Sequence, residues 1–169
     1  MRRAGGALRR AFRVVLASVR PQRHFLQAQL QRYYGIPFVD RGLTRDGCDC
    51  WGLVRLVILE QTGIKLPAYP EISPGASLTK LRTILAAADG PEWLEIHPGQ
   101  EKPFDVVLMK GIVLHDGTRH QRPIHIGCVI EPGTLIHIEQ GSDVTVIDYL
   151  SHPRMKHRIA GFYRHHKLA

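Results

Sequence analysis

The chain has 169 residues, of which 44% are hydrophobic and 22% charged, and its formal net charge is +8. This length suits one domain with a substantial core and is too short for two comfortable ones. Three cysteines are a low and odd number, which argues against a fold held by disulfides and favours synthesis in a reducing compartment.

The positive charge is concentrated at the start of the chain. Seven arginines and no acidic residue precede His24, and subtracting these seven from +8 leaves +1 for the rest. We therefore expect no specific nucleic-acid surface on the body. Residues 1–21 are interpreted as a basic arm, either a docking helix or a solvated tail, and residues 22–169 as the domain. The run VVLASV is too short for a membrane span or a signal peptide.

Helical patterns come first along the chain. The first is predicted to open at Pro21 and end at Gly35, and an ordered loop, GIPFVDRGLTRDG, follows it. A second helix is predicted to begin after an N-cap at Asp49 and to stop at Gly63. Ser77 is predicted to cap a third, whose apolar residues continue to Ala88.

Strand patterns fill the rest of the chain. Five apolar segments are separated by turn residues such as EPGT and QGSD: FDVVLM, IHIGCVI, TLIHIE, VTVID and RIAGFYR. Helices first and a meander of strands after them predict an α+β fold. We expect N-terminal helices packed on a C-terminal antiparallel sheet of about five to six strands.

Cys50 is the candidate nucleophile. If Asp49 caps the second helix, Cys50 is its first residue, where unpaired N–H groups and the helix dipole favour a thiolate. Cys48 precedes the cap and lies outside that field. Gly52 is expected to leave room for a substrate backbone near the sulfur. A cysteine at a helix start is more often a small buried apolar residue, so the assignment needs a base.

Two of the ten histidines, His125 and His137, differ from the others because each lies inside an apolar strand segment. If Glu131–Gly133 form a three-residue loop, Gly127 opposes His137, and His125 lies diagonal to His137 on the same face. A two-residue turn would put the two histidines on opposite faces, so an odd loop or a bulge is required. His125 would then act as the base and His137 as the residue that orients it.

These motifs resemble those of the NlpC-type cell-wall cysteine peptidases, a branch of the papain-like fold. The resemblance runs from about Gln22 to Arg164 and rests on five segments: YYGIPFVDRG, DGCDCWGLV, PFDVVLM, HIGCVI and LIHIEQG. It implies that Cys50 is the nucleophile, His125 the base and His137 the orienting residue. It also implies hydrolysis of γ-D-glutamyl–diaminopimelate or related amide bonds in peptidoglycan stem peptides, without a cofactor or metal.

Three further segments, DCWGLVRLV, GIKLPAYP and IAGFYR, look most like members found in tails of bacteriophages and gene-transfer particles. That likeness implies a tail-tip enzyme, made in the bacterial cytoplasm without a signal peptide, that opens the host wall in the periplasm. Its partners would be tail-tip or hub proteins.

Several residues near the nucleophile are candidates for substrate binding. Trp51 stands where the family usually has Ser, and Phe38 where a Tyr is frequent. Asp40 and Arg41 are candidates to bind charged stem-peptide ends, although a surface ion pair is an equal alternative, and Asp49 completes the set. The segment KGIVLHDGTRHQRP is a longer connection than the family's usual one.

Three rival interpretations stay open. The first is a structural tail-tip or plug protein that keeps the fold without turnover. The second is a metal site of Cys48, Cys50, Cys128 and histidines, although a Cys-x-Cys pair without a second spaced pair is a weak zinc signal. The third is an amidase or acyl-transfer reaction on another amide or ester.

Overall fold

A computed structural model describes residues 28–69, 86 and 89–169. The chain divides into two compact units, Met1–Tyr34 and Gly35–Ala169. The described part of the first contains a short 3-10 helix, η1 (Gln31–Tyr33). The arm 1–21, most of the helix predicted from Pro21 and nearly all of the helix predicted from Ser77 lie outside the described residues. The domain boundary at residue 22 therefore stays a prediction.

The helix α2 (Cys50–Thr62) has the ends that the sequence predicts. Asp49 is its N-cap, and Gly63 follows it in the left-handed conformation, at φ 75°, with its N–H donating to the Leu59 carbonyl at 2.9 Å. Glycine is favoured there because it has no Cβ to clash. The apolar residues Leu53, Val54, Val57 and Ile58 of this helix are all buried.

A two-stranded hairpin precedes this helix. It consists of β1 (Leu43–Thr44) and β2 (Gly47–Cys48), which pair antiparallel. The predicted ordered loop thus contains a small hairpin that ends two residues before Cys50. Both β1 and β2 contact α2.

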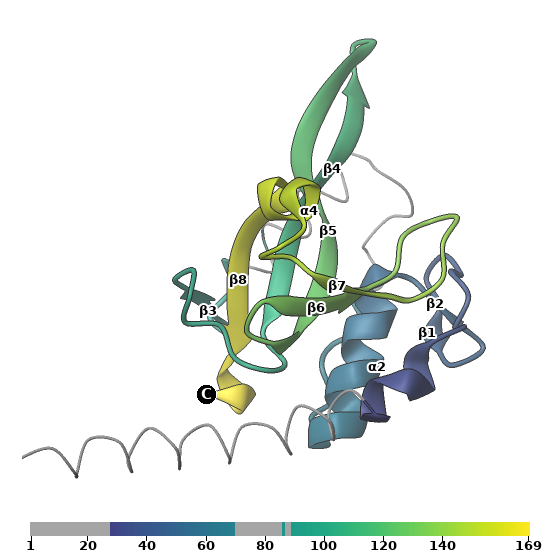
Figure 1. Cartoon of the computed structure of the whole chain (residues 1–169), viewed down its shortest axis with the longest axis vertical. Helices are drawn as coiled ribbons and strands as arrows, with labels where there is room; N and C mark the ends of the chain where they lie inside the picture. Colours follow the sequence, from purple (N-terminus) through teal and green to yellow (C-terminus); the bar gives the residue numbers. More distant parts are fainter. Residues whose placement is uncertain (1–27, 70–85, 87–88) are drawn as a thin grey trace, which may run out of the picture. The chain divides into compact units, whose positions relative to one another are not determined.

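Six antiparallel strands form the sheet in the order β3-β8-β4-β5-β6-β7 (Figure 1). Their bounds are β3 (Trp93–Ile96), β4 (Val106–His115), β5 (Thr118–Glu131), β6 (Thr134–His137), β7 (Thr145–Asp148) and β8 (Ile159–His165). The predicted α+β class and strand number are confirmed. Five strands fall on the five predicted segments, and β3, a short edge strand, was not predicted. α2 packs against β5 and β6.

Two short helices were also not predicted. They are α4 (Pro153–Arg158) and the 3-10 helix η2 (His166–Leu168). Only Met155 of α4 is buried, so the segment has too few apolar residues to show a helical period. Met155 joins the core cluster on the sheet, whose other buried members are Val107, Met109, Val129, Leu135, Tyr149 and Phe162.

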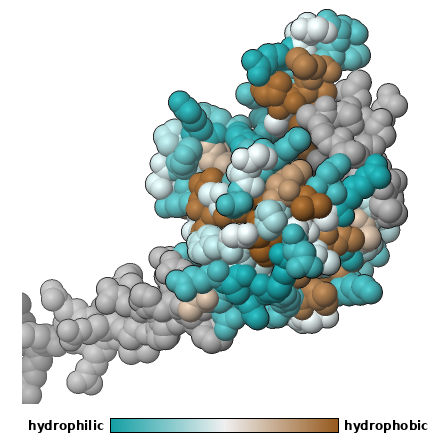
Figure 2. All heavy atoms as spheres, turned by 90° about the vertical axis from the view of Figure 1, so that its right-hand side faces the viewer, coloured by the Kyte–Doolittle hydropathy of each residue, from teal (hydrophilic) through white to brown (hydrophobic). Residues whose placement is uncertain are grey.

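The segment KGIVLHDGTRHQRP is not a loop, contrary to its interpretation as a connection. β4 and β5 remain paired as far as His115 and Thr118, and a two-residue turn of Asp116 and Gly117 joins them. Both turn residues have positive φ, 51° and 73°, which is the type I′ geometry that an Asp-Gly pair favours. The result is a long hairpin that extends past the other strands of the sheet (Figure 1). Figure 2 shows hydrophobic atoms gathered below its tip, and Ile112 and Leu114 are exposed there.

Candidate active site

Cys50 occupies the first position of α2 and is held there by the cap. The Asp49 carboxylate accepts a hydrogen bond from the Gly52 N–H at 2.7 Å, and the Asp49 carbonyl accepts the Leu53 N–H at 2.9 Å. Cys50 is 4% exposed and lines a pocket. The sequence prediction that its sulfur lies at the mouth of a helix is confirmed.

The other two cysteines are in different surroundings. Cys48 is fully buried, and burial, followed by the charges of Asp49 and Cys50, raises the pKa of its thiol to about 12. Burial likewise raises the pKa of Cys128. Neither residue lines the pocket that contains Cys50. Both are therefore protonated at neutral pH, and neither is suited to be a nucleophile.

Gly52 does not have the role that the sequence suggested. A Cβ built on this residue would lie 2.0 Å from the carbonyl oxygen of Gly42 and 3.1 Å from the Cβ of Cys48. The space above Gly52 is thus filled by the chain's own backbone and not by a substrate. The Gly42 carbonyl also accepts the Asp49 N–H at 3.1 Å, so this close approach fixes the start of α2 against the preceding hairpin.

His125 and His137 come together through a β-bulge. Glu131 pairs with Thr134, so the loop between β5 and β6 has two residues, and of the two alternatives, an odd loop or a bulge, the structure has the bulge. A register shift between Val129 and Glu131 then gives the pair Cys128–Ile136. One further step along this register sets Gly127 opposite His137, as predicted, because the bulge supplies the extra residue.

The two imidazoles are in direct contact. Nε2 of His125 lies 3.0 Å from Nδ1 of His137, and the rings meet edge to face with centroids 5.2 Å apart. Both residues are buried, at 8% and 6% exposure. Burial lowers the pKa of His137, with smaller opposite effects of Glu139, which raises it, and Arg158, which lowers it. His137 is therefore neutral at neutral pH and can orient His125 without adding charge.

Two charged residues that the sequence analysis did not assign lie beside the histidines. Oε1 of Glu139 is 3.5 Å from Nε2 of His125 and 3.9 Å from Nδ1 of His137. The guanidinium of Arg158 forms an ion pair with the same oxygen, and its Nε donates to the Lys110 carbonyl at 2.9 Å. Glu139 has a sequence signal, since it follows His137 by two residues and strand residues two apart share a face. Arg158 had none, because α4 was not predicted.

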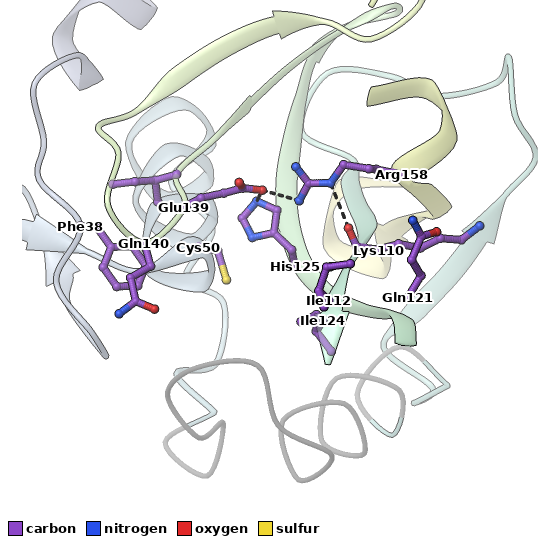
Figure 3. A pocket seen from close by; sticks show the side chains of 12 residues that line it. Phe38, Cys50, Lys110, Ile112, Gln121, Ile124, His125, Glu139, Gln140 and Arg158 are labelled. Carbon is purple, nitrogen blue, oxygen red and sulfur yellow. Dashed lines mark hydrogen bonds and ion pairs between the residues drawn. The ribbon is translucent and has the colours of Figure 1, made fainter. Parts of the chain in front are cut away.

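A pocket of about 450 Å³ lies beside these groups (Figure 3). Cys50, His125, Glu139 and Arg158 all line it. The remaining lining is mixed, with apolar Phe38, Ile112, Ile124 and Ile138 and polar Lys110, Gln121 and Gln140. Such a pocket suits a ligand that has both apolar and polar groups.

Of the predicted substrate-binding residues, Phe38 alone lines this pocket together with Cys50. Asp40 and Arg41 are exposed, and their proposed contact with stem-peptide ends stays a prediction. Asp49 caps α2. Trp51 is buried, donates from Nε1 to the Pro67 carbonyl at 3.1 Å, and contacts the rings of Tyr69 and Trp93. It does not line the pocket, and consecutive helical residues are rotated by roughly 100°, so Trp51 and Cys50 are on different sides of α2.

One group in the described part of the chain has donors placed for a metal ion. His125, His137 and Glu139 each offer one ligand atom, and these atoms lie within 4.8 Å of one another. Two imidazoles and a carboxylate are a donor set that zinc accepts, although the ligand oxygen of Glu139 already forms an ion pair with Arg158. Cys48, Cys50 and Cys128 do not belong to this group, so the structure does not assemble the cysteine-based site considered above.

None of the helices in the described residues has the length and apolar character that a membrane crossing requires.

No curated protein matches the sequence. Among solved structures, the NlpC/p60 domain of the peptidoglycan hydrolase SagA is 21% identical, with a TM-score of 0.48, over 82% of this chain and 93% of that one.

A second solved structure, a Staphylococcus aureus protein described as similar to a lipoprotein of the NLP/P60 family, is 19% identical with a TM-score of 0.50. The match covers 82% of this chain and 39% of that one, and it supports a common fold. The model of the NlpC/P60 family matches residues 35–164, a range that contains Cys50, His125 and His137. Because this range is well over half of the sequence, the chain belongs to the NlpC/P60 family.

Proposed function

We propose that this protein is a peptidoglycan hydrolase that works as a cysteine peptidase. The observation that carries the proposal is the shared pocket of Cys50 and His125, with His137 in contact with His125 at 3.0 Å. A thiol at a helix start, an imidazole beside it and a second group that orients the imidazole are the parts that thiol catalysis needs. Membership in the NlpC/P60 family supports a peptidoglycan substrate.

In the proposed reaction, His125 takes the proton of the Cys50 thiol, and the sulfur attacks the carbonyl carbon of the scissile amide. The backbone N–H of Cys50 is the proposed donor to the oxyanion. His125 then returns the proton to the leaving amine, and the C–N bond breaks to leave a thioester. A water molecule, deprotonated by His125, then attacks the thioester carbon. The C–S bond breaks, the carboxylate product leaves, and the Cys50 sulfur recovers the proton from His125.

We propose a stem-peptide amide of the γ-D-glutamyl–diaminopimelate type as the bond cleaved. The sequence resemblance suggests this bond, and the mixed lining of the pocket is compatible with it. Stem peptides carry both methyl groups and free carboxylates, and the pocket offers isoleucines together with Lys110 and Gln121.

The proposed setting is the tail tip of a phage or gene-transfer particle, where the enzyme would open the host wall for DNA delivery. Three segments support this setting by resemblance: DCWGLVRLV, GIKLPAYP and IAGFYR. Labelled antibodies against the chain, viewed on purified particles by electron microscopy, test the setting. Label at the tail tip is expected, and particles that lack the chain would contradict it.

Digestion of purified peptidoglycan tests the proposed reaction. The wild-type chain should release stem-peptide fragments with new amino groups, identified by mass spectrometry. Cys50→Ala should abolish this release, whereas Cys48→Ala, a matched control two residues away, should retain it. Equal activity of wild type and Cys50→Ala would refute the nucleophile. A wild-type chain that assembles into particles but cleaves no stem peptide would favour the structural plug instead.

A further inference from the structure

The contact between the two histidines leaves one requirement of the proposed reaction unmet. When His125 holds the proton of the thiol it is a buried cation, and a buried charge needs compensation. His137 is neutral at neutral pH, because burial lowers its pKa. A neutral imidazole accepts a hydrogen bond but adds no negative charge. The Cys50 thiolate carries a negative charge only until its sulfur attacks the carbonyl carbon, so compensation that lasts through both steps must come from another side chain.

We propose that Glu139 is a positioning residue whose carboxylate stabilises protonated His125, and that Arg158 holds this carboxylate in place. The inference rests on the proposed cysteine-peptidase function and adds two residues to it. Oε1 of Glu139 lies 3.5 Å from the same nitrogen of His125 that contacts His137. The N–H of protonated His125 thus faces two acceptors, His137 and Glu139, of which only Glu139 is charged. Figure 3 shows Glu139 beside His125, with Arg158 on the carboxylate.

Arg158 is placed to orient the carboxylate. Its guanidinium pairs with Glu139, and its Nε donates to the carbonyl of Lys110 at 2.9 Å. Lys110 lies beside a register shift in the pairing of β4 with β5. The arginine therefore joins three elements, α4, β4 and the chain after β6. An arginine that also donates to a backbone carbonyl holds a carboxylate in one geometry better than an arginine whose one partner is the carboxylate.

The other charged and titratable groups around His125 do not replace this carboxylate. Cys50, on α2, carries the negative charge of the reaction itself and loses it when the thioester forms. His137, on β6, is neutral. Lys110, on β4, and Arg158, on α4, line the same pocket as cations and oppose protonation of His125. Among the described residues that line the pocket, Glu139 is the one carboxylate.

Glu139→Gln tests the role of the charge, because it keeps the shape of the side chain. Without the carboxylate, protonated His125 is less stable, so the alkaline limb of kcat/KM should move to lower pH. An opposite charge at this separation shifts such an equilibrium by at least about tenfold, or about one pH unit. We expect kcat to fall about tenfold or more at pH 8, with little change in KM, since Glu139 acts through His125.

A second measurement needs no peptidoglycan. The rate at which iodoacetamide alkylates Cys50 should show the same displaced limb in Glu139→Gln. Glu139→Asp, which retains the charge, should restore much of the wild-type profile. Glu60→Gln is the matched control, because Glu60 pairs with Arg45 at the surface, and it should leave both profiles unchanged.

The role of Arg158 is tested by a double-mutant cycle. If Arg158 acts by holding Glu139, then Glu139→Gln should cost clearly less in an Arg158→Met background than in the wild type. Equal costs in the two backgrounds would refute the role of Arg158.

These results separate the inference from the proposed function. An inactive Cys50→Ala variant together with coincident pH profiles of Glu139→Gln and wild type would overturn the role of Glu139 alone. Retained activity of Cys50→Ala would overturn both.

Discussion

Replacing Gly52 with alanine sets helix propensity against the packing of the active-site helix. In an open helix this change would raise the free energy of unfolding by about 1 kcal/mol, because alanine is the better helix former. In this fold the new Cβ would lie 2.0 Å from the Gly42 carbonyl oxygen, whereas ordinary contact begins at 3.4 Å. Both atoms belong to or are bound directly to backbone, so neither can rotate away as a side chain would.

We therefore expect Gly52→Ala to destabilise the protein. Overpacking of this kind costs roughly 1–3 kcal/mol, and the rigid neighbour places the cost at the upper end, which leaves a net loss of about 2 kcal/mol. For a chain of this size, that loss lowers Tm by roughly 4–8 °C. The free energy of unfolding is measured by urea denaturation with circular dichroism.

The same change should also slow alkylation of Cys50, because α2 must move away from the Gly42 carbonyl. Leu59→Ala is the control, since Leu59 is a half-exposed residue of the same helix, and it should leave the alkylation rate unchanged. A Gly52→Ala protein as stable as the wild type, or more stable, would show that helix propensity outweighs the contact and that this reasoning is wrong.

Three further predictions concern stability and the helix cap. Arg164→Met should lower the free energy of unfolding by about 3–5 kcal/mol. The reason is that the buried carboxylate of Asp105 loses the guanidinium that contacts both its oxygens at 2.7 Å. Arg45→Met, which removes an exposed ion pair, should cost less than about 1 kcal/mol when both variants are measured by urea denaturation. Asp49→Ala removes the cap of α2 and should cost about 1 kcal/mol, whereas Asp49→Asn, which keeps an acceptor oxygen, should cost less; equal losses would contradict the cap. Burial lowers the pKa of His165, so this residue binds a proton more readily after unfolding. The free energy of unfolding should therefore be highest above the unfolded pKa of about 6.5 and should fall as the pH drops below it. His165→Phe should reduce this dependence on pH, measured by urea denaturation at pH 5–7.

The sequence by itself was sufficient for the features that local chemistry decides. Asp49 and Gly63 act on the backbone within one turn of their own positions, so both ends of α2 were predictable. Alternating apolar residues identified five of the six strands, and the unusual apolar surroundings of His125 and His137 singled out this pair. The Asp116–Gly117 turn was not predicted, because the segment around it was interpreted as a long connection.

Tertiary structure decided the rest, because it depends on contacts between distant residues. The bulge between Val129 and Glu131 sets the register of the histidines, whereas the loop residues alone left an odd loop and a bulge as alternatives. Trp51 and Gly52 looked like parts of a substrate groove, but one is packed in the core and the other faces a backbone carbonyl. The ion pair of Glu139 with Arg158 depends on a six-residue helix with one buried side chain, and such a helix forms through packing against the sheet and not through its own propensity.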